Sequence, residues 1–256
     1  MKKTLIALGI SGCFAAPLAN ADTILGIYAG AGVWQSDLSG SIAETGTIEA
    51  DLRDLGIQDQ DVNFVYIALE HPVPVIPNIR LQMTDLAVDG SGALTTDFTL
   101  DGQTFSASSD VNSDIDLSHT DATLYYELLD NWITLDFGLT FRQFDGSIDV
   151  AAVSGPQAGT SVSEEFDETL PLVYLKGQFD LPLTGFYAGA AGNYIGYDGN
   201  DMTDYQLFAG WMSDGWVFDL GVEVGYRTFS LTLDDVADLD ADLELDGAYA
   251  SLNIHF

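Results

Sequence analysis

The sequence is short of cysteine. Cys13 is the only one among 256 residues, and it lies in the N-terminal segment where a secretory signal peptide would be found. Without residues 1–21 the chain has no cysteine at all. An exported protein of this sequence must therefore be held together by hydrogen bonds and packing, with no disulfide.

Basic residues are scarce as well. The chain has 7 Lys and Arg against 40 Asp and Glu, and its formal net charge is −33. A nucleic-acid-binding protein needs a basic face for the phosphates, so this composition excludes nucleic acid as a partner. A large net charge can indicate disorder, but the 47% hydrophobic and 11% aromatic content indicates a folded chain.

Long apolar runs are the third absence. Beyond residue 21 no stretch of 18 apolar residues occurs, whereas a membrane-spanning helix needs about 20. Backbone polar groups inside a bilayer must all be paired within the protein, so without such helices only a closed β-barrel could span a membrane.

The N-terminus has the three parts of a secretory signal peptide. Lys2 and Lys3 are basic, residues 4–16 are apolar, and Ala19-Asn20-Ala21 is a small-x-small cleavage site. We expect cleavage after Ala21, which leaves residues 22–256 as one domain. Lipoprotein processing at Cys13 is the alternative, and it would use a much shorter apolar segment.

Ten strand-like segments follow, joined by connections that alternate between short and mostly long. Short turns at one end and longer loops at the other are typical of outer-membrane barrels, which have an even number of strands. We therefore expect an all-β, transmembrane, antiparallel up-and-down barrel of ten strands, with eight or twelve as alternatives. Long loops are expected over residues 35–60, 90–113 and 146–167, with a hairpin turn at 100–103. The strands are expected near residues 24–35, 61–71, 78–90, 114–128, 132–145, 168–181, 185–197, 203–212, 216–231 and 241–256.

Alternation within these segments assigns the two faces of the barrel. From Ile133 to Arg142, large apolar residues alternate with Thr, Asp, Gly and Arg, and the segment up to Arg227 repeats the pattern. An Arg facing lipid at the bilayer centre would cost about 2–4 kcal/mol, so both arginines should point into the lumen. The same alternation places Asp204 and Gln206 inward. It predicts a lumen charge network of Glu70, Arg80, Asp121, Glu127, Asp136, Arg142, Lys176, Asp219, Glu223 and Arg227. Since a ten-stranded lumen is narrow, we favour a salt-bridged plug over an ion pathway.

Around the start of the last segment, apolar residues alternate with the acids Asp238, Asp240, Asp242, Glu244 and Asp246. These acids share their parity with Leu252, Ile254 and Phe256, which should face lipid. The strand must therefore either leave the hydrocarbon near Gly247 or contain a β-bulge there. Leu243 occupies the position where an EF-hand loop needs Gly. A solvated acidic surface is the plainer interpretation; the alternative is binding of divalent cations that bridge lipopolysaccharide phosphates, with no confident metal site. The candidate ligands are Asp198, Asp201, Asp204, Asp238, Asp240 and Asp242.

The histidines do not form a catalytic pattern. Ser118 and His119 are adjacent in a strand and so point to opposite faces. Ser251 and His255 share a face but are four residues apart, too far for a hydrogen bond along an extended strand. His71 stands beside a single carboxylate, and no G-x-S-x-G turn occurs. We expect no enzyme and no cofactor; a lipid hydrolase or acyltransferase is the least favoured alternative.

The block Glu70-His-Pro-Val-Pro-Val-Ile-Pro-Asn-Ile-Arg-Leu81 resembles the signature of a family of small proteobacterial outer-membrane β-barrel proteins with no assigned activity. Residues 124–131 and 135–139 and the triplet Gly225-Tyr-Arg227 are also similar to that family, and the resemblance extends over essentially the whole chain. It implies an outer-membrane barrel and supplies no functional residues.

The last strand resembles the assembly signal of such barrels, with Leu252, Ile254 and the terminal aromatic Phe256 as its residues. We therefore expect the barrel assembly machinery, outer-membrane lipid and lipopolysaccharide as partners. The leading functional hypothesis is a structural or surface-interaction barrel with a plugged lumen. A narrow channel, or a carrier of a small apolar ligand, is the alternative.

Overall fold

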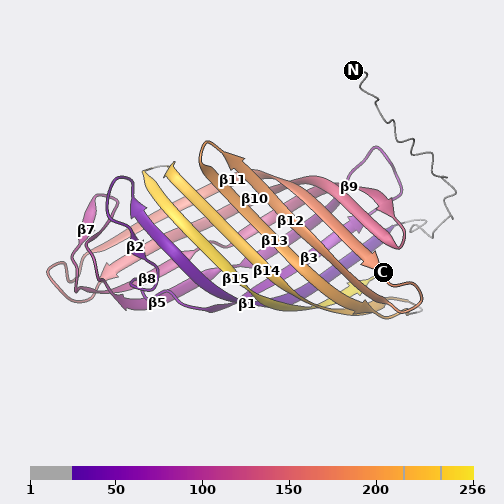
Figure 1. The fold of residues 1–256 in the computed structure, drawn as a ribbon, viewed down its shortest axis with the longest axis horizontal. Helices are drawn as coiled ribbons and strands as arrows, with labels where there is room; N and C mark the ends of the chain where they lie inside the picture. The colour runs from indigo at the N-terminus through magenta and orange to yellow at the C-terminus, as the bar shows by residue number, and fades with distance from the viewer. Residues whose placement is uncertain (1–24, 216, 237) are drawn as a thin grey trace, which may run out of the picture.

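The chain forms a sheet that closes on itself (Figure 1). The computed structural model describes residues 25–215, 217–236 and 238–256; the predicted signal peptide lies outside them. The first and last strands pair with each other, and every barrel strand has an antiparallel neighbour on each side. The prediction of a closed ten-stranded antiparallel barrel is confirmed. Its strands are β1 (Gly26–Glu44), β3 (Gln60–Glu70), β4 (Asn78–Asp85), β9 (His119–Asp130), β10 (Ile133–Ala152), β11 (Ser161–Asp180), β12 (Phe186–Tyr197), β13 (Asn200–Met212), β14 (Asp219–Val236) and β15 (Leu239–His255).

Four short turns lie at one end of the barrel, which we call the turn side; the opposite end is the loop side. In Figure 1 the turn side is on the right. The β3–β4 turn contains Pro72, Pro74 and Pro77, which lack amide donors and so stop both strands from continuing. Among the described residues, no helix is long and apolar enough to span a membrane.

Shorter strands extend the barrel on the loop side. β5 (Ala87–Ala93) continues β4, and β8 (Asp110–Asp116) pairs with both β5 and β10. β6 (Phe98–Leu100) and β7 (Gln103–Phe105) form a separate hairpin. Its turn residues Asp101 and Gly102 have φ values of 46° and 66°, the positive values that a two-residue type I′ turn requires. The hairpin turn predicted at residues 100–103 is therefore confirmed.

Each of the three predicted long loops contains strand, so this part of the sequence prediction is wrong. β1 continues to Glu44, β10 continues to Ala152, and β11 begins at Ser161. β1 stays paired with β15, and β10 with β11, so both pairs extend beyond the apolar band of the outer surface. The prediction failed because, where the apolar band ends, the outward face of each strand becomes polar and the inward face becomes apolar.

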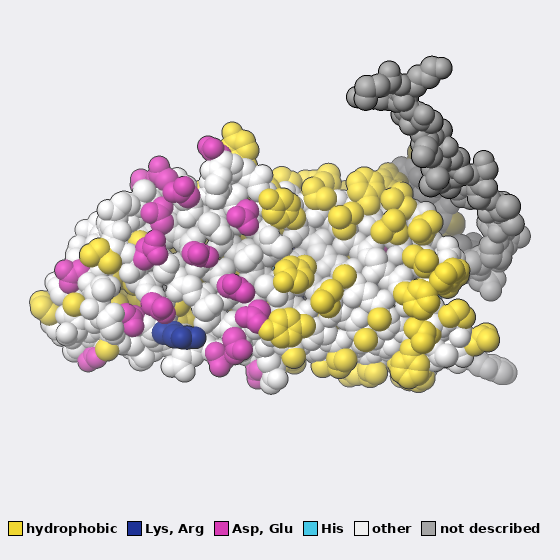
Figure 2. Space-filling model, in the orientation of Figure 1, with side chains coloured by type: hydrophobic (Ala, Val, Ile, Leu, Met, Phe, Trp, Pro, Cys, Tyr) yellow, Lys and Arg dark blue, Asp and Glu magenta, His cyan; other side chains and the backbone are white. Residues whose placement is uncertain are grey.

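β10 shows this reversal within one uninterrupted strand. Up to Phe141 its outward residues are large and apolar, while inward residues such as Asp136 and Arg142 are polar. From Gln143 to Asp149 the outward residues are polar, and the inward ones are apolar and buried, beginning with Phe144. Figure 2 shows the result: hydrophobic side chains cover the turn-side half of the outer surface, and acidic side chains cover the loop-side half.

The same change in β15 answers the parity question raised by the sequence. Its pairing with β14 continues through Gly247, which lies opposite Arg227, and its register with β1 is the same on both sides of that residue. No register shift occurs near Gly247. The outward acids of β15 therefore lie beyond the apolar band, where the inward residues Leu243 and Leu245 are buried.

The loop-side half has an ordinary hydrophobic core in place of a polar lumen. The connection after β1 turns inward through β2 (Ala50–Asp51), which pairs with β1. It then buries Leu52, Leu55 and Ile57 completely. These side chains pack with inward residues of the barrel strands, so the loop-side end of the lumen is filled with apolar side chains.

Candidate functional site

A layer of buried charges crosses the lumen below this core. Arg142 on β10 donates two hydrogen bonds to its cross-strand neighbour Asp121 on β9, from Nε to Oδ1 and from Nη2 to Oδ2, both at 2.7 Å. Two parallel bonds between a guanidinium and a carboxylate are among the strongest side-chain contacts in proteins. Arg142 is 0% exposed and Asp121 is 4% exposed.

Asp204 on β13 joins this pair to the opposite wall. Its Oδ2 accepts a hydrogen bond from Arg142 Nη2 at 2.6 Å, and its two oxygens accept from Arg227 Nε and Nη2 at 2.8 and 2.7 Å. Two carboxylates and two guanidiniums thus form one neutral network that extends from β9 to β14. Such pairing offsets the large cost of moving charges out of water.

Aromatic rings of the apolar core cover the loop-side face of this layer. The Arg227 guanidinium carbon lies 4.7 Å from the centre of the Trp34 ring, and that of Arg142 lies 5.8 Å from the Phe229 ring. Both distances suit cation–π contacts. Next to Arg142, Thr140 donates to Asn193 at 2.7 Å. The lumen thus changes from polar to apolar within one layer of side chains.

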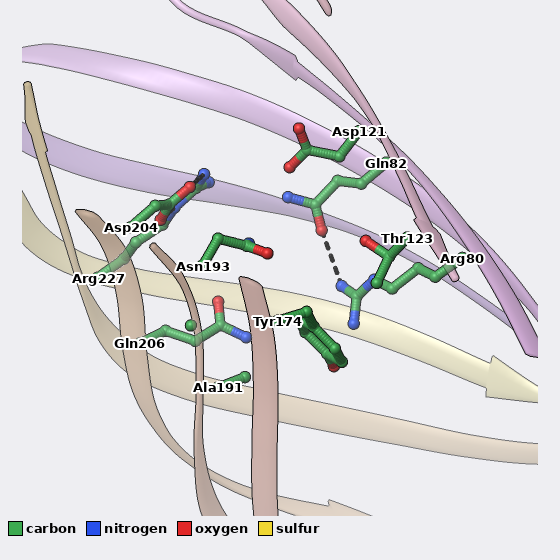
Figure 3. A pocket seen from close by; sticks show the side chains of 11 residues that line it. Arg80, Gln82, Asp121, Thr123, Tyr174, Ala191, Asn193, Asp204, Gln206 and Arg227 are labelled. Atoms are coloured by element: carbon green, nitrogen blue, oxygen red, sulfur yellow. Dashed lines mark hydrogen bonds and ion pairs between the residues drawn. The ribbon is translucent and has the colours of Figure 1, made fainter. Parts of the chain in front are cut away.

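Below the network the lumen narrows to a cavity of about 40 Å³, shown in Figure 3. Its wall includes Asp204 and Arg227 on one side and Arg80 on the other. Arg80 donates to Gln82 Oε1 at 2.8 Å, and its guanidinium lies 4.1 Å from the centre of the Tyr66 ring. We predicted that Arg80 would neutralise acids; its closest contacts are instead an amide and an aromatic ring.

A larger cavity of about 310 Å³ lies on the turn side, and we call it the vestibule. It shares Arg80 and Tyr174 with the small cavity, so the two are adjacent. Five more residues of the predicted charge network line it: Glu70, Glu127, Asp136, Lys176 and Glu223. Lys176 Nζ lies 3.7 Å from Asp136 Oδ2.

The predicted network is therefore divided among three places. Asp121, Arg142 and Arg227 meet in the central layer, and most other members line the vestibule. Asp219 lies nearer the turn-side rim, where His255 Nδ1 approaches its Oδ2 at 3.3 Å. The sequence did not identify Asp204 as the centre of the network. Alternation along the strand placed Asp204 inward, but because it lies close to a connection it was also counted among the loop carboxylates.

The proposed metal ligands do not converge. Among the described residues, no group of three or more His, Cys, Asp or Glu side chains is placed to hold a metal ion. Asp198 and Asp238 are turn residues with φ values of 53° and 65°. Asp240 accepts hydrogen bonds from Asp235 N and from Thr45 Oγ1, both at 2.9 Å, and these bonds lower its pKa. Turn conformation accounts for Asp198 and Asp238, and hydrogen bonds account for Asp240.

The histidine and serine side chains are also engaged in local contacts. His119 is buried, with Nδ1 2.9 Å from Leu117 O, while Ser118 Oγ accepts a hydrogen bond from Leu86 N. His71 Nδ1 accepts from Val73 N inside the proline-containing turn. Neither the His71 ring nor the His119 ring is hydrogen-bonded to a Ser hydroxyl.

The residues of the predicted assembly signal lie along the seam where the barrel closes. Leu252 and Phe256 are 69% and 55% exposed on the outer face. The backbone of Phe256 exchanges hydrogen bonds with that of Ile27 on β1, at 2.9 and 3.2 Å. These positions are consistent with a lipid-facing end of the last strand; recognition by an assembly factor stays a prediction.

Comparison with solved structures identifies the fold. The outer membrane protease OmpT from Escherichia coli matches 91% of this chain and 96% of its own, with a TM-score of 0.54 and 12% identity. A FadL homologue from Pseudomonas aeruginosa gives a TM-score of 0.35 at 10% identity, covering 91% of this chain and 90% of its own. The Pseudomonas putida toluene transporter TodX gives 0.29 at 9% identity, covering 90% and 89%. No protein-family model and no curated protein matches the sequence. At such low identity, the likeness to OmpT shows a ten-stranded outer-membrane type of barrel and no activity.

Proposed function

We propose that this protein is an outer-membrane barrel closed to transport, which carries a rigid acidic extension on the cell surface. The observation that carries the proposal is the cross-lumen network of Asp121, Arg142, Asp204 and Arg227, with the apolar core directly above it. A water-filled pathway would have to pass both. The turn side would face the periplasm and the loop side the exterior, as in other outer-membrane barrels.

Closure is tested by electrical recording from the refolded protein in planar lipid bilayers. We expect no stepwise conductance for the wild-type chain. The Arg142→Ala variant removes the central cation, and we expect occasional openings from it at most, because the apolar core still fills the loop-side half. Stepwise wild-type currents that Arg142→Ala or Asp136→Ala abolishes would contradict the proposal and favour a narrow channel.

The charge of the outer surface supports a surface role. Of the five basic residues in residues 22–256, all described, Arg53 alone lies on the outer surface; the other four point into the lumen. The loop-side surface is otherwise acidic (Figure 2).

Anionic lipopolysaccharide would be repelled from such a surface unless divalent cations screened the phosphates. Lipopolysaccharide that stays bound in Mg²⁺ and is released by a chelator would support this role; retention in the chelator would oppose it.

The proposal includes no catalytic step. Ser118 lies in the short break between β8 and β9, His119 begins β9, and each already has a backbone partner. An assay of phospholipid and lipid A turnover tests this part. Product formation that His119→Ala abolishes would replace the surface role with an enzymatic one.

A further inference from the structure

The vestibule has the size and access of a ligand site. Its volume of about 310 Å³ is at the lower end of the range for small-molecule pockets, about 300–1,000 Å³. It extends from Arg80, below the central network, to Asp130 and Asn131 at the turn side, where both residues are exposed. A solute on the turn side could therefore enter it without passing the network.

Its wall carries an excess of negative charge. Six acidic side chains line the cavity, whereas its basic side chains are Arg80, Lys176 and His255. An excess of charge of one sign in a cavity with low-dielectric walls concentrates ions of the opposite sign. The vestibule should thus attract cations. The acids are Glu70, Glu127, Asp130, Asp136, Asp180 and Glu223.

Tyrosine hydroxyls hold two of these carboxylates in place. Tyr125 donates to Glu70 Oε1 at 2.6 Å, and Tyr249 donates to Glu223 Oε1 at 2.8 Å. Each carboxylate has about four acceptor sites, so it can still accept from a ligand. The tyrosine rings add apolar wall between the carboxylates. Fixed acceptors separated by aromatic surface suit a ligand in which cationic groups are joined by methylene segments.

Asp136 gives an independent sign that a donor is missing. The residue is only 1% exposed and lines the vestibule, yet its Oδ1 has no hydrogen-bond partner. Its other oxygen, Oδ2, has only Lys176 Nζ at 3.7 Å. A buried acceptor without a partner costs about 1–3 kcal/mol. Because Oδ1 has almost no accessible surface, the carboxylate must turn toward the cavity before a bound ammonium group can donate to it.

The arrangement favours an organic cation over a metal ion. Glu70, Glu127 and Glu223 lie on β3, β9 and β14, spaced around the wall. Among the described residues, no group of three such side chains converges as a metal requires. We propose that the vestibule binds a linear aliphatic polyamine, with one ammonium group donating to the Asp136 carboxylate, turned toward the cavity, and another reaching Glu70 or Glu223.

Isothermal titration of the refolded protein, residues 22–256, with spermidine tests this inference. We expect saturable binding with one site per chain, weakened about tenfold or more by Asp136→Asn because a charged hydrogen-bond acceptor is lost. Asp114→Asn, an acid on the outer loop-side surface, is the matched control and should leave the affinity unchanged. Equal weakening by both variants, or equal binding of fully acetylated neutral spermidine, would overturn the proposal.

Two further measurements keep the test decisive. Glu70→Gln should also weaken binding several-fold, and it replaces Asp136→Asn if that variant does not show the heat-dependent gel mobility of a folded barrel. Mg²⁺ at the same ionic strength should compete poorly with spermidine. If Mg²⁺ at an equal concentration abolished the heat of spermidine binding, the binding would reflect a diffuse counterion atmosphere, and a polyamine site would be refuted.

Discussion

Arg142 and Asp204 are joined across the lumen by a 2.6 Å hydrogen bond, although they lie on β10 and β13, which are not neighbours in the sheet. Strand pairing holds neighbouring strands together, whereas this contact braces opposite walls of the barrel. Because Arg142 also holds Asp121, and Asp204 also holds Arg227, the loss of one member leaves another charge buried with too few partners.

Arg142→Ala should therefore destabilise the barrel by about 3–5 kcal/mol, the usual cost of leaving a buried charge without its partner. Asp121 would lose both of its bonds to Arg142. The free energy of unfolding in detergent, from denaturant titration followed by Trp and Tyr fluorescence, measures the effect.

Two comparisons separate this effect from a general loss of a positive charge. Arg53→Ala on the outer surface should change the unfolding free energy by no more than about 0.5 kcal/mol. The double variant Arg142→Met with Asp121→Leu removes both charges and should recover part of the loss. If Arg53→Ala and Arg142→Ala destabilise the barrel equally, the contact of Arg142 with Asp204 across the lumen does not stabilise the barrel.

The inward turn after β1 should be as important to the loop-side half. Leu55 is fully buried in the apolar core, and Leu55→Ala should cost about 2–5 kcal/mol of unfolding free energy. Ile48, seven residues earlier in the same connection, is 58% exposed, so Ile48→Ala is the control and should be nearly neutral. Faster proteolysis between β1 and β3 in Leu55→Ala alone would locate the damage; equal proteolysis of both variants would argue against a packed plug.

The sequence predicted the strand count and the inward direction of Arg142 and Arg227 because both depend on local information. Alternation over neighbouring residues and the cost of an Arg in lipid are sufficient for these predictions. The contact between Asp204 and Arg142 depends on how strands three places apart face each other across the lumen. A single sequence carries no signal for that distance.

The loop-side half was misjudged for a different reason. Alternation of Leu243 and Leu245 with acids indicates a half-buried strand, but by itself does not say which face is buried. We used one rule, apolar outward, to set the strand ends, and so predicted loops at residues 35–60 and 146–167. It holds only within the apolar band, and the structure reverses it at Phe141 and Arg142 in β10.

A row of aspartates on the outer loop-side surface should make that region sensitive to pH. Asp114 on β8 lies opposite Asp89 on β5 and Asp149 on β10. Burial, and then the neighbouring carboxylates Asp149, Asp89 and Asp116, raise the pKa of Asp114. Since its pKa is higher in the folded than in the unfolded state, the folded state binds the proton more tightly, and stability falls as the pH rises through that pKa.

We therefore expect amide hydrogen exchange in β5 and β8 to be slower near the raised pKa of Asp114 than at neutral pH, after correction for the intrinsic pH dependence of exchange. Asp114→Asn should remove this pH dependence and protect the same amides at neutral pH. Asp240→Asn, whose carboxyl has a lowered pKa, should not protect them. Faster corrected exchange at the lower pH in the wild-type chain would contradict the assignment to Asp114.

Gly247 lies where β15 leaves the apolar band, and the structure leaves no room for a side chain there. A Cβ at this position would collide with the backbone carbonyl oxygen of Gln35 on β1. Gly247→Ala should thus force β1 and β15 apart at the seam that closes the barrel, with a cost of about 1–3 kcal/mol for overpacking.

The matched control is Gly177→Ala on β11, where an added Cβ would have no atom within 4 Å. Heat-dependent gel mobility measures closure: Gly247→Ala should unfold at a lower temperature than the wild-type chain, and Gly177→Ala should not. Identical transitions for both variants would show that the seam tolerates separation at this point, and the close approach of β1 and β15 would then not be what stabilises closure.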